Sequence, residues 1–225
     1  MRFFAGNRTL PGITLVAVFL SALFARADSG AIFRADFSNP NISPSHWTLT
    51  IYPDGTGHFH SERGNPPAQD PPVMDAPNVD RNIQVSNDFA QRVFREAHAR
   101  TATTSDCESH MKVAFQGWKK LTYDGPDGNW SCEFNYSRDK QLQALGDSLM
   151  AVASTILEGA RLEMLLQHDR LGLDREMEYI SDASGDGRLA QICTISAILE
   201  RLADDPDVMD RVRKRARTLL AKSER

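Results

Sequence analysis

The chain has 225 residues, of which 41% are hydrophobic and 25% charged, and its formal net charge at pH 7 is −4. This length can bury a sizeable core in one domain, with room for an appended lobe. The acidic balance favours solubility and argues against general binding to nucleic acid or to an anionic membrane.

The first 27 residues have the order of a secretory signal peptide. Arg2 and Arg8 come first, an apolar run from Ile13 to Phe24 follows, and Ala25-Arg26-Ala27 has the pattern of a cleavage site. The apolar run is short for a permanent membrane span. We therefore expect cleavage after Ala27, which removes three arginines and changes the net charge from −4 to −7. An uncleaved signal anchor is the alternative, because the apolar run extends close to the cleavage site.

Export would place the chain in the periplasm or the medium, where disulfides persist. Three cysteines then predict one disulfide and one spare thiol, and we expect Cys107 to pair with Cys132. Cys193 falls in an apolar helical pattern, which is typical of a buried small hydrophobe.

Several stretches of the first part of the chain predict strands. Residues 31–37 indicate a short entering strand or arm. Residues 46–61 predict a β-hairpin, because Trp47, Leu49 and Ile51 alternate with polar residues before the turn sequence PDGTG. Residues 64–80 include five prolines, so we expect an exposed, extended connection there. Residues 82–85 predict one more short strand.

Residues 111–136 combine a clear period of two with the highest density of aromatic residues. Val113 and Phe115 begin the alternation, and Gly117 interrupts it as a bulge would, before the turn sequence DGPDGN. One face of the return strand is predicted to carry Trp130, Cys132, Phe134 and Tyr136. We expect this hairpin at the centre of the sheet, with its aromatic face as the floor of the core. A ligand platform made by these aromatic residues is the alternative.

Apolar residues at spacings of three and four predict two helices before residue 170. Ser86 is expected to cap a helix that runs to about His98. A long helix is predicted from about Arg138 to His168. Gly146 and Gly159 lie inside it, and a kink or close packing against the sheet would explain them.

The C-terminal part is predicted to be almost entirely helical. We expect a short helix over 173–180, a longer one over 188–202, and a last helix with Asp205 as its N-cap and Pro206 at its first position. Strands early and helices late predict an α+β fold: a small antiparallel sheet of β-hairpins packed on a long helix, followed by a C-terminal helical lobe. The expected divisions are a signal peptide at 1–27, an α+β domain at 28–168 and the helical lobe at 169–225.

The order of these elements resembles that of an uncharacterised family of secreted bacterial α+β proteins. The residues that carry the resemblance are Trp47, Leu49, Ile51, Asp54, Gly55, Gly57, Tyr123, Asp124, Gly125, Tyr136 and Ser137. They are turn and core residues, so the resemblance implies a fold and no catalytic residues. Separately, the pattern from Asp204 to Ala216 looks like a single HEAT-type repeat, which implies a helical pair docked on the rest of the chain.

Two stretches carry metal-ligand residues. His58 and His60 flank Phe59 on a predicted strand, so both imidazoles would project from the same side, with Asp54 near the turn and His46 on the opposing strand. A solvated strand face is the ordinary explanation of such a pair. Residues 182–189 resemble the first half of an EF-hand loop, but Cys193 stands where the bidentate glutamate should be. We therefore expect no bound cofactor, with the two histidines as the metal candidates.

The sequence RVRKRAR at 211–217 is strongly basic, and Arg213, Lys214 and Arg217 could form a surface for an anionic partner. Cations late in a helix also complement its dipole, which is the alternative explanation. No motif brings a nucleophile and a base together. We therefore expect a monomeric, non-catalytic binding module of the cell envelope or extracellular space, with a protein or small-molecule partner. The alternative is a metal-dependent hydrolase that uses His58 and His60.

Overall fold

The computed structural model describes residues 1, 30–65, 78–100 and 107–223. The predicted signal peptide and most of the proline-rich segment lie outside these residues. Within them, none of the helices combines the length and the apolar character that a membrane crossing requires.

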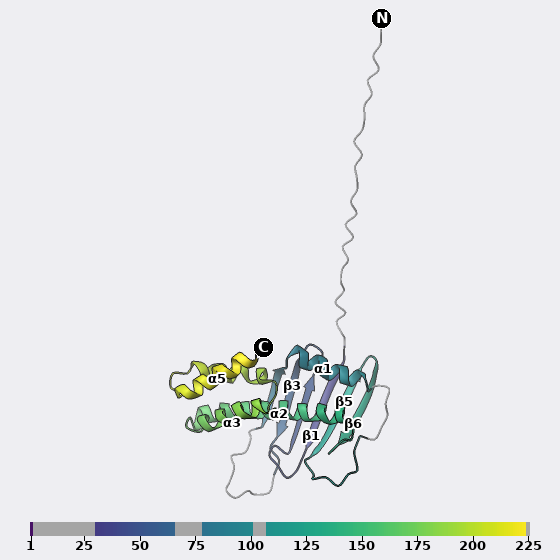
Figure 1. The fold of residues 1–225 in the computed structure, drawn as a ribbon, viewed down its shortest axis with the longest axis horizontal. Coiled ribbons are helices and arrows are strands. Elements are labelled where there is room, and N and C mark those ends of the chain that lie inside the picture. The colour runs from purple at the N-terminus through teal and green to yellow at the C-terminus, as the bar shows by residue number, and fades with distance from the viewer. Residues whose placement is uncertain (2–29, 66–77, 101–106, 224–225) are drawn as a thin grey trace.

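The chain forms one six-stranded antiparallel sheet with the strand order β4-β3-β2-β1-β5-β6 (Figure 1). The strands are β1 (Ile32–Ser38), β2 (His46–Ile51), β3 (Thr56–Glu62), β4 (Val79–Gln84), β5 (Trp118–Gly125) and β6 (Gly128–Phe134). The hairpin predicted over 46–61 is confirmed as β2 and β3. Gly55 in its turn has φ +80°, and a side chain there would meet the Val85 carbonyl oxygen, so this turn requires glycine.

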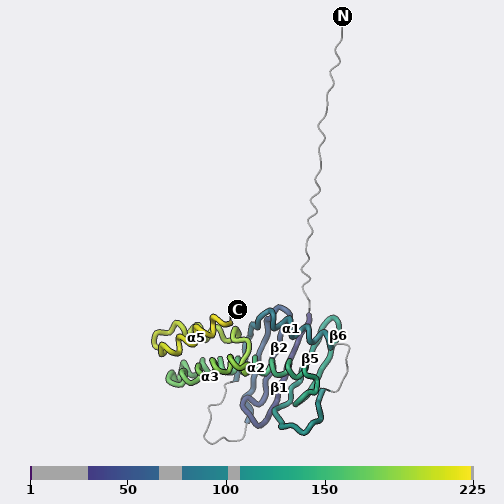
Figure 2. The backbone as a smooth tube through the Cα atoms, in the orientation of Figure 1, coloured from purple at the N-terminus to yellow at the C-terminus, as the bar shows by residue number. Residues whose placement is uncertain are grey.

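The prediction that the aromatic hairpin lies at the centre of the sheet is wrong. β5 and β6 form one side of the sheet, and β6 is an edge strand. The centre of the sheet is the pair of β2 and β1, and β1 pairs with β2 on one side and with β5 on the other (Figure 2). The sequence did not reveal this role, because a clear alternating pattern shows that a segment is a strand and does not show how many neighbouring strands it has.

The hairpin also begins later than predicted. Val113 and Phe115 lie in an irregular segment before β5, and both side chains are exposed. The buried Asn135 occupies the hydrogen-bonding groups of this segment, since its amide donates to the Ala114 carbonyl and accepts from the Gln116 amide. The inward face ends at Phe134, and Tyr136 is exposed.

Five α-helices and one short 3₁₀ helix occur in the described residues: α1 (Asn87–His98), α2 (Lys140–His168), α3 (Leu173–Gly185), η1 (Ile192–Ile195), α4 (Ser196–Asp204) and α5 (Asp210–Ser223). The Ser86 cap of α1 is confirmed, because its hydroxyl accepts from the Phe89 amide. The predicted fold class is also confirmed. α1 and α2 cover one face of the sheet, and α3 to α5 form a lobe beside it (Figure 1).

Three predictions in the lobe need correction. α3 continues to Gly185 and is longer than expected. The helix predicted from Arg188 begins only at Ser196, because Gln191 adopts a left-handed conformation and η1 follows it. Asp205 ends α4 and does not begin the last helix, since its carboxylate accepts from the Asp207 amide and forms a tight turn.

The apolar residues form two cores. The first lies between the sheet, α1 and the first two-thirds of α2, and the second lies within α3, η1, α4, α5 and the end of α2. The two glycines of α2 are explained by close packing, since Gly146 faces the Phe134 ring and Gly159 faces Ile195 of η1. Gly159 therefore packs against the lobe and not against the sheet.

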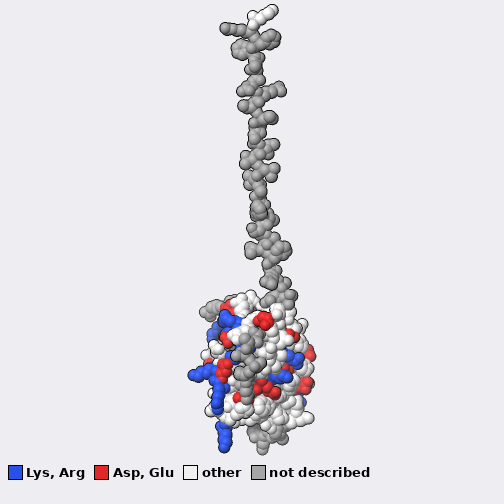
Figure 3. All heavy atoms as spheres, turned by 90° about the vertical axis from the view of Figure 1, so that its right-hand side faces the viewer, with Lys and Arg blue, Asp and Glu red and all other residues white. Residues whose placement is uncertain are grey.

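The Cys107–Cys132 disulfide is confirmed. It fastens the segment that precedes β5 to the edge strand β6. Glu108 adds to this attachment, because its carboxylate accepts from the Asn135 amide at 2.6 Å and from the His110 amide at 3.2 Å. The surface on this side carries acidic and basic side chains interspersed, so neither sign dominates it (Figure 3).

We predict that Gly159→Ala destabilises the protein by about 1–3 kcal/mol, the usual cost of overpacking. A β-carbon at this position would lie 2.3 Å from the Ile195 side chain. Gly185→Ala is the matched control, because it is also a helical glycine and has no neighbour within 4 Å of the added carbon. Urea unfolding of both variants measures the difference. Equal stabilities of the two variants would show that η1 can move away from α2 at little cost.

A second contact between α2 and the lobe involves two glutamates. Burial, together with a smaller contribution from the hydrogen bond and charge of the Glu176 carboxyl group on α3, raises the pKa of Glu158 to about 8. Arg161 acts in the opposite direction, with its Nε 3.1 Å from Glu158 Oε2. The two carboxyl groups therefore retain a proton at neutral pH.

The unfolded chain releases the Glu158 proton near pH 4.5 and the folded chain near pH 8, so stability falls as the pH rises through this interval. We predict that Glu158→Gln flattens this fall and stabilises the protein at pH 8 by on the order of a few kcal/mol. Urea unfolding at several pH values measures it. Glu200→Gln, at an exposed glutamate of α4, should leave the slope unchanged. If the free energy of unfolding of Glu158→Gln fell with pH as steeply as that of the unaltered protein, Glu158 and Glu176 would not share a proton.

Candidate functional site

The two faces of the sheet differ in chemistry. Most inward positions of the strands are apolar and buried under α1 and α2, with Arg81 of β4 and Lys119 of β5 as charged exceptions. Outward positions carry mostly polar and charged side chains, and in the described chain these stay exposed or half-buried because no helix packs on them. This is the usual division of an antiparallel sheet with one solvated face. Any ligand of the sheet must therefore meet the outward face, which we call the open face.

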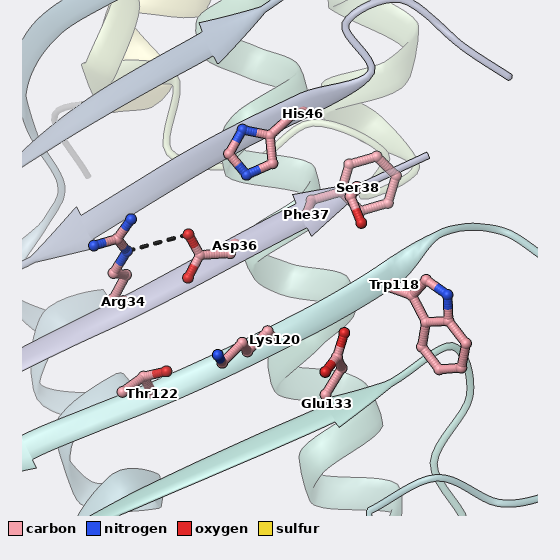
Figure 4. A pocket seen from close by; sticks show the side chains of 9 residues that line it. All are labelled: Arg34, Asp36, Phe37, Ser38, His46, Trp118, Lys120, Thr122 and Glu133. Atoms are coloured by element: carbon pink, nitrogen blue, oxygen red, sulfur yellow. Dashed lines mark hydrogen bonds and ion pairs between the residues drawn. The ribbon is translucent and has the colours of Figure 1, made fainter. Parts of the chain in front are cut away.

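A pocket of about 510 Å³ lies on the open face where β2, β1, β5 and β6 run side by side (Figure 4). We call it the open-face pocket. Its lining residues are Arg34, Asp36, Phe37, Ser38, His46, Trp118, Lys120, Thr122 and Glu133. The antiparallel register explains how residues far apart in sequence meet here. Asp36 of β1 is paired with Lys120 of β5, and Lys120 is paired with Glu133 of β6.

Asp36 is held in position by its neighbours. Arg34 Nε donates to Asp36 Oδ1 at 3.1 Å, and Thr48 Oγ1 donates to the same oxygen at 3.0 Å. Both bonds reach Oδ1, which leaves Oδ2 as an acceptor for a ligand. The aspartate therefore has a fixed orientation without being saturated.

Four other pocket residues carry unused polar groups. Within the described chain, His46, Trp118, Lys120 and Glu133 form neither a hydrogen bond nor an ion pair through their side chains. Lys120 and Glu133 are opposite each other on adjacent strands, yet no ion pair joins them. The pocket thus offers donors from lysine, histidine and indole, and acceptors from two carboxylates, to whatever enters it.

The charges of the open-face pocket balance. Arg34 and Lys120 are cationic, and Asp36 and Glu133 are anionic. Such a site exerts little net attraction on an ion, in contrast to a pocket lined by one sign of charge.

An exposed aromatic pair lies at the end of the pocket. Trp118 is 40% exposed and Phe115 is 46% exposed, and their rings contact each other edge to face at 6.0 Å. The segment that carries Phe115 is fixed by the hydrogen bonds of Asn135 and by a bond from the Asn39 amide to the Gln116 carbonyl. These apolar surfaces are therefore held outward by a rigid support, and such exposure indicates a contact site.

The predicted histidine pair lies elsewhere on the same face. His58 Nε2 and His60 Nδ1 each lie 2.9 Å from a carboxylate oxygen of Asp80 on β4. Asp54, the carboxylate expected beside them, instead accepts from Thr56 in the turn. Among the residues that the structure describes, no group of three or more metal-ligand side chains is placed to hold an ion. The metal hypothesis stays a prediction, with Asp80 and not Asp54 as the nearest carboxylate.

The basic residues of α5 have local partners. Arg213 and Lys214 both contact Asp210, and Arg217 donates to the Ala203 carbonyl at 2.7 Å. The Lys214 ammonium lowers the pKa of Asp210. These contacts supply a structural role for the cations, and an anionic partner at this surface stays untested.

The spare cysteine and the EF-hand-like sequence both lie in secondary structure that the sequence did not predict. Cys193 is partly buried in η1, where burial raises the pKa of its thiol. Asp182 and Ser184 lie within α3, so the start of the EF-hand-like sequence is helix and not a calcium loop. Asp186, just after α3, is paired with Arg188.

Sequence reasoning singled out only His46 among the pocket residues, as a metal ligand on the strand opposite His58 and His60, but His46 is paired with Glu62 and lies in the open-face pocket. The signal of the other pocket residues is present, since Arg34 and Asp36, like Lys120 and Thr122, occupy alternate polar positions of two strands. Only the pairing of β1 with β5 brings these strands together, and that pairing joins segments separated by the whole of β2 to α1. Trp118 was missed because it follows the glycine interpreted as a bulge.

Comparison with known proteins gives no identity for the chain: none of the protein-family models matches it, and no curated protein shows significant similarity. The class of protein is therefore defined by the fold and the open face alone.

We predict that Asp80→Asn lowers the pKa of His60 toward its ordinary value of 6.5. The hydrogen bond that the His60 ring donates to the Asp80 carboxylate is the main cause that raises this pKa, and Glu62 adds a smaller contribution. The measurement is an NMR titration of the imidazole ring protons. Asp54→Asn is the control and should leave His60 unaffected. If the His60 titration midpoint changed in Asp54→Asn but not in Asp80→Asn, Asp54 would be the carboxylate beside the histidine pair, as the sequence predicted.

Proposed function

We propose that the protein is a non-catalytic binding module whose open-face pocket holds a polar ligand. One observation carries this proposal: four side chains with free polar groups and one fixed carboxylate converge on a single pocket of about 510 Å³. Polar groups that converge in a concavity and lack protein partners are the ordinary mark of a ligand site.

The arrangement supports binding more than catalysis. Ser38 and His46 are opposite each other in the register of β1 and β2, but no hydrogen bond joins the hydroxyl to the imidazole. A nucleophile normally has such a bond to its base. Arg34 and Thr48 hold the Asp36 carboxylate in one orientation, which is what a ligand-binding acceptor requires.

The cell envelope or the extracellular space is the proposed location. The N-terminal sequence has the pattern of an export signal. The Cys107–Cys132 disulfide supports the same location, because disulfides persist in oxidising compartments.

NMR titration of the isotope-labelled protein tests the pocket. The probes are sucrose, citrate, spermidine and glycylglycine at millimolar concentrations, which sample neutral, anionic, cationic and zwitterionic polar ligands. We expect at least one probe to shift the amide resonances of pocket residues on β1, β5 and β6, and the same probe to lose this effect in Asp36→Ala. Absence of shifts on the open face with all four probes, or shifts confined to other surfaces, would contradict the proposal.

A further inference from the structure

We infer that the ligand of the open-face pocket is a neutral carbohydrate chain. This inference rests on the proposed function and specifies its ligand class. It follows from three properties of the site: balanced charge, many fixed donors and acceptors, and an exposed aromatic surface at one end.

The balanced charge selects against ions. A small anion near Lys120 would also face Asp36 and Glu133, and a small cation would face Arg34 and Lys120. An ion loses its hydration when it enters the pocket. Because the pocket carries both positive and negative side chains, its attraction for the ion is largely offset by repulsion. A neutral polar molecule avoids this conflict and still uses every group.

The polar groups suit hydroxyl groups. A hydroxyl both donates and accepts, so it can bond to a carboxylate and to an ammonium group alike. Asp36 offers Oδ2, Glu133 offers a carboxylate, and Lys120 offers an ammonium group, all within one row across three adjacent strands. A molecule with several neighbouring hydroxyls can engage these acceptors and donors together.

The aromatic residues distinguish sugar from other hydroxyl-rich solutes. A pyranose ring presents a face of C–H groups, which packs on the surface of an indole ring. Trp118 lines the pocket and is 40% exposed, and the Phe115 ring, which contacts it edge to face, continues the aromatic surface. Two aromatic surfaces in contact, next to a row of hydrogen-bonding groups, match a chain of sugar units more closely than a single one.

Titration calorimetry and NMR of the full chain with three hexasaccharides test the inference. The probes are hexamers of β-1,4-linked glucose, β-1,4-linked N-acetylglucosamine and α-1,4-linked glucose. We expect at least one of them to shift the Trp118 indole resonance, which Trp118→Phe identifies by removing it, and to bind with measurable heat.

Variants separate stacking from charge. Trp118→Ala should weaken binding of the active hexasaccharide at least tenfold. Tyr52→Ala is the matched control, since Tyr52 is also 40% exposed but lies outside the pocket, and it should leave binding unchanged. Glu133→Gln retains a hydrogen-bonding group without the charge, so it should change the affinity for a neutral sugar less than threefold. A tenfold loss in Glu133→Gln would indicate a cationic ligand and overturn the inference.

The failures can be told apart. If none of the hexasaccharides shifts pocket resonances while citrate or spermidine does, the carbohydrate inference is wrong and the binding function stands. If neither the hexasaccharides nor the ionic and zwitterionic probes affect the open face, both the inference and the proposed function are wrong. Equal binding by Trp118→Ala and the unaltered protein would also overturn the inference.

Discussion

One helix, α2, contributes side chains to both hydrophobic cores, and the arrangement of the molecule depends on this sharing. With 29 residues at about 1.5 Å each, it extends over roughly 43 Å, which is longer than the sheet alone requires. Its first turns pack on the strands and its last turns on the lobe. Arg81 of β4 forms two bonds to Glu163 on this helix, and the buried Thr155 hydroxyl bonds to the backbone of Ala190. The lobe is therefore attached to the sheet through the interior.

The coverage of one face by α1 and α2 determines where a ligand can bind. The sheet has no second layer over its outward face in the described chain, so that face keeps its polar residues hydrated in the absence of a ligand. A rigid sheet then offers a fixed spacing of side chains across neighbouring strands. This pre-arrangement lowers the entropy lost on binding, because the groups that contact the ligand are already positioned.

The elements that the sequence predicted well are those specified by local pattern. The hairpin over β2 and β3, the Ser86 cap and the long α2 each follow from residues close together in the chain. The features that it did not predict depend on distant partners. β1 gains its inner position from β5, and Phe115 leaves the strand because Asn135 holds its segment. The candidate site belongs to the second kind, since its residues come from four strands. Alternation identifies their outward direction, but it does not say which strands are neighbours.

During synthesis, β1 acquires its two neighbouring strands at different times. The first four strands and α1 precede β5 in the sequence. Because synthesis starts at the N-terminus, these four strands can pair before β5 has been made. During that interval the side of β1 that later meets β5 is an unpaired edge, which is a template for incorrect association between chains. Arg34 and Asp36 stand in the middle of this edge. Charged side chains discourage strand addition by another chain, so the residues that line the pocket also protect the unfinished sheet.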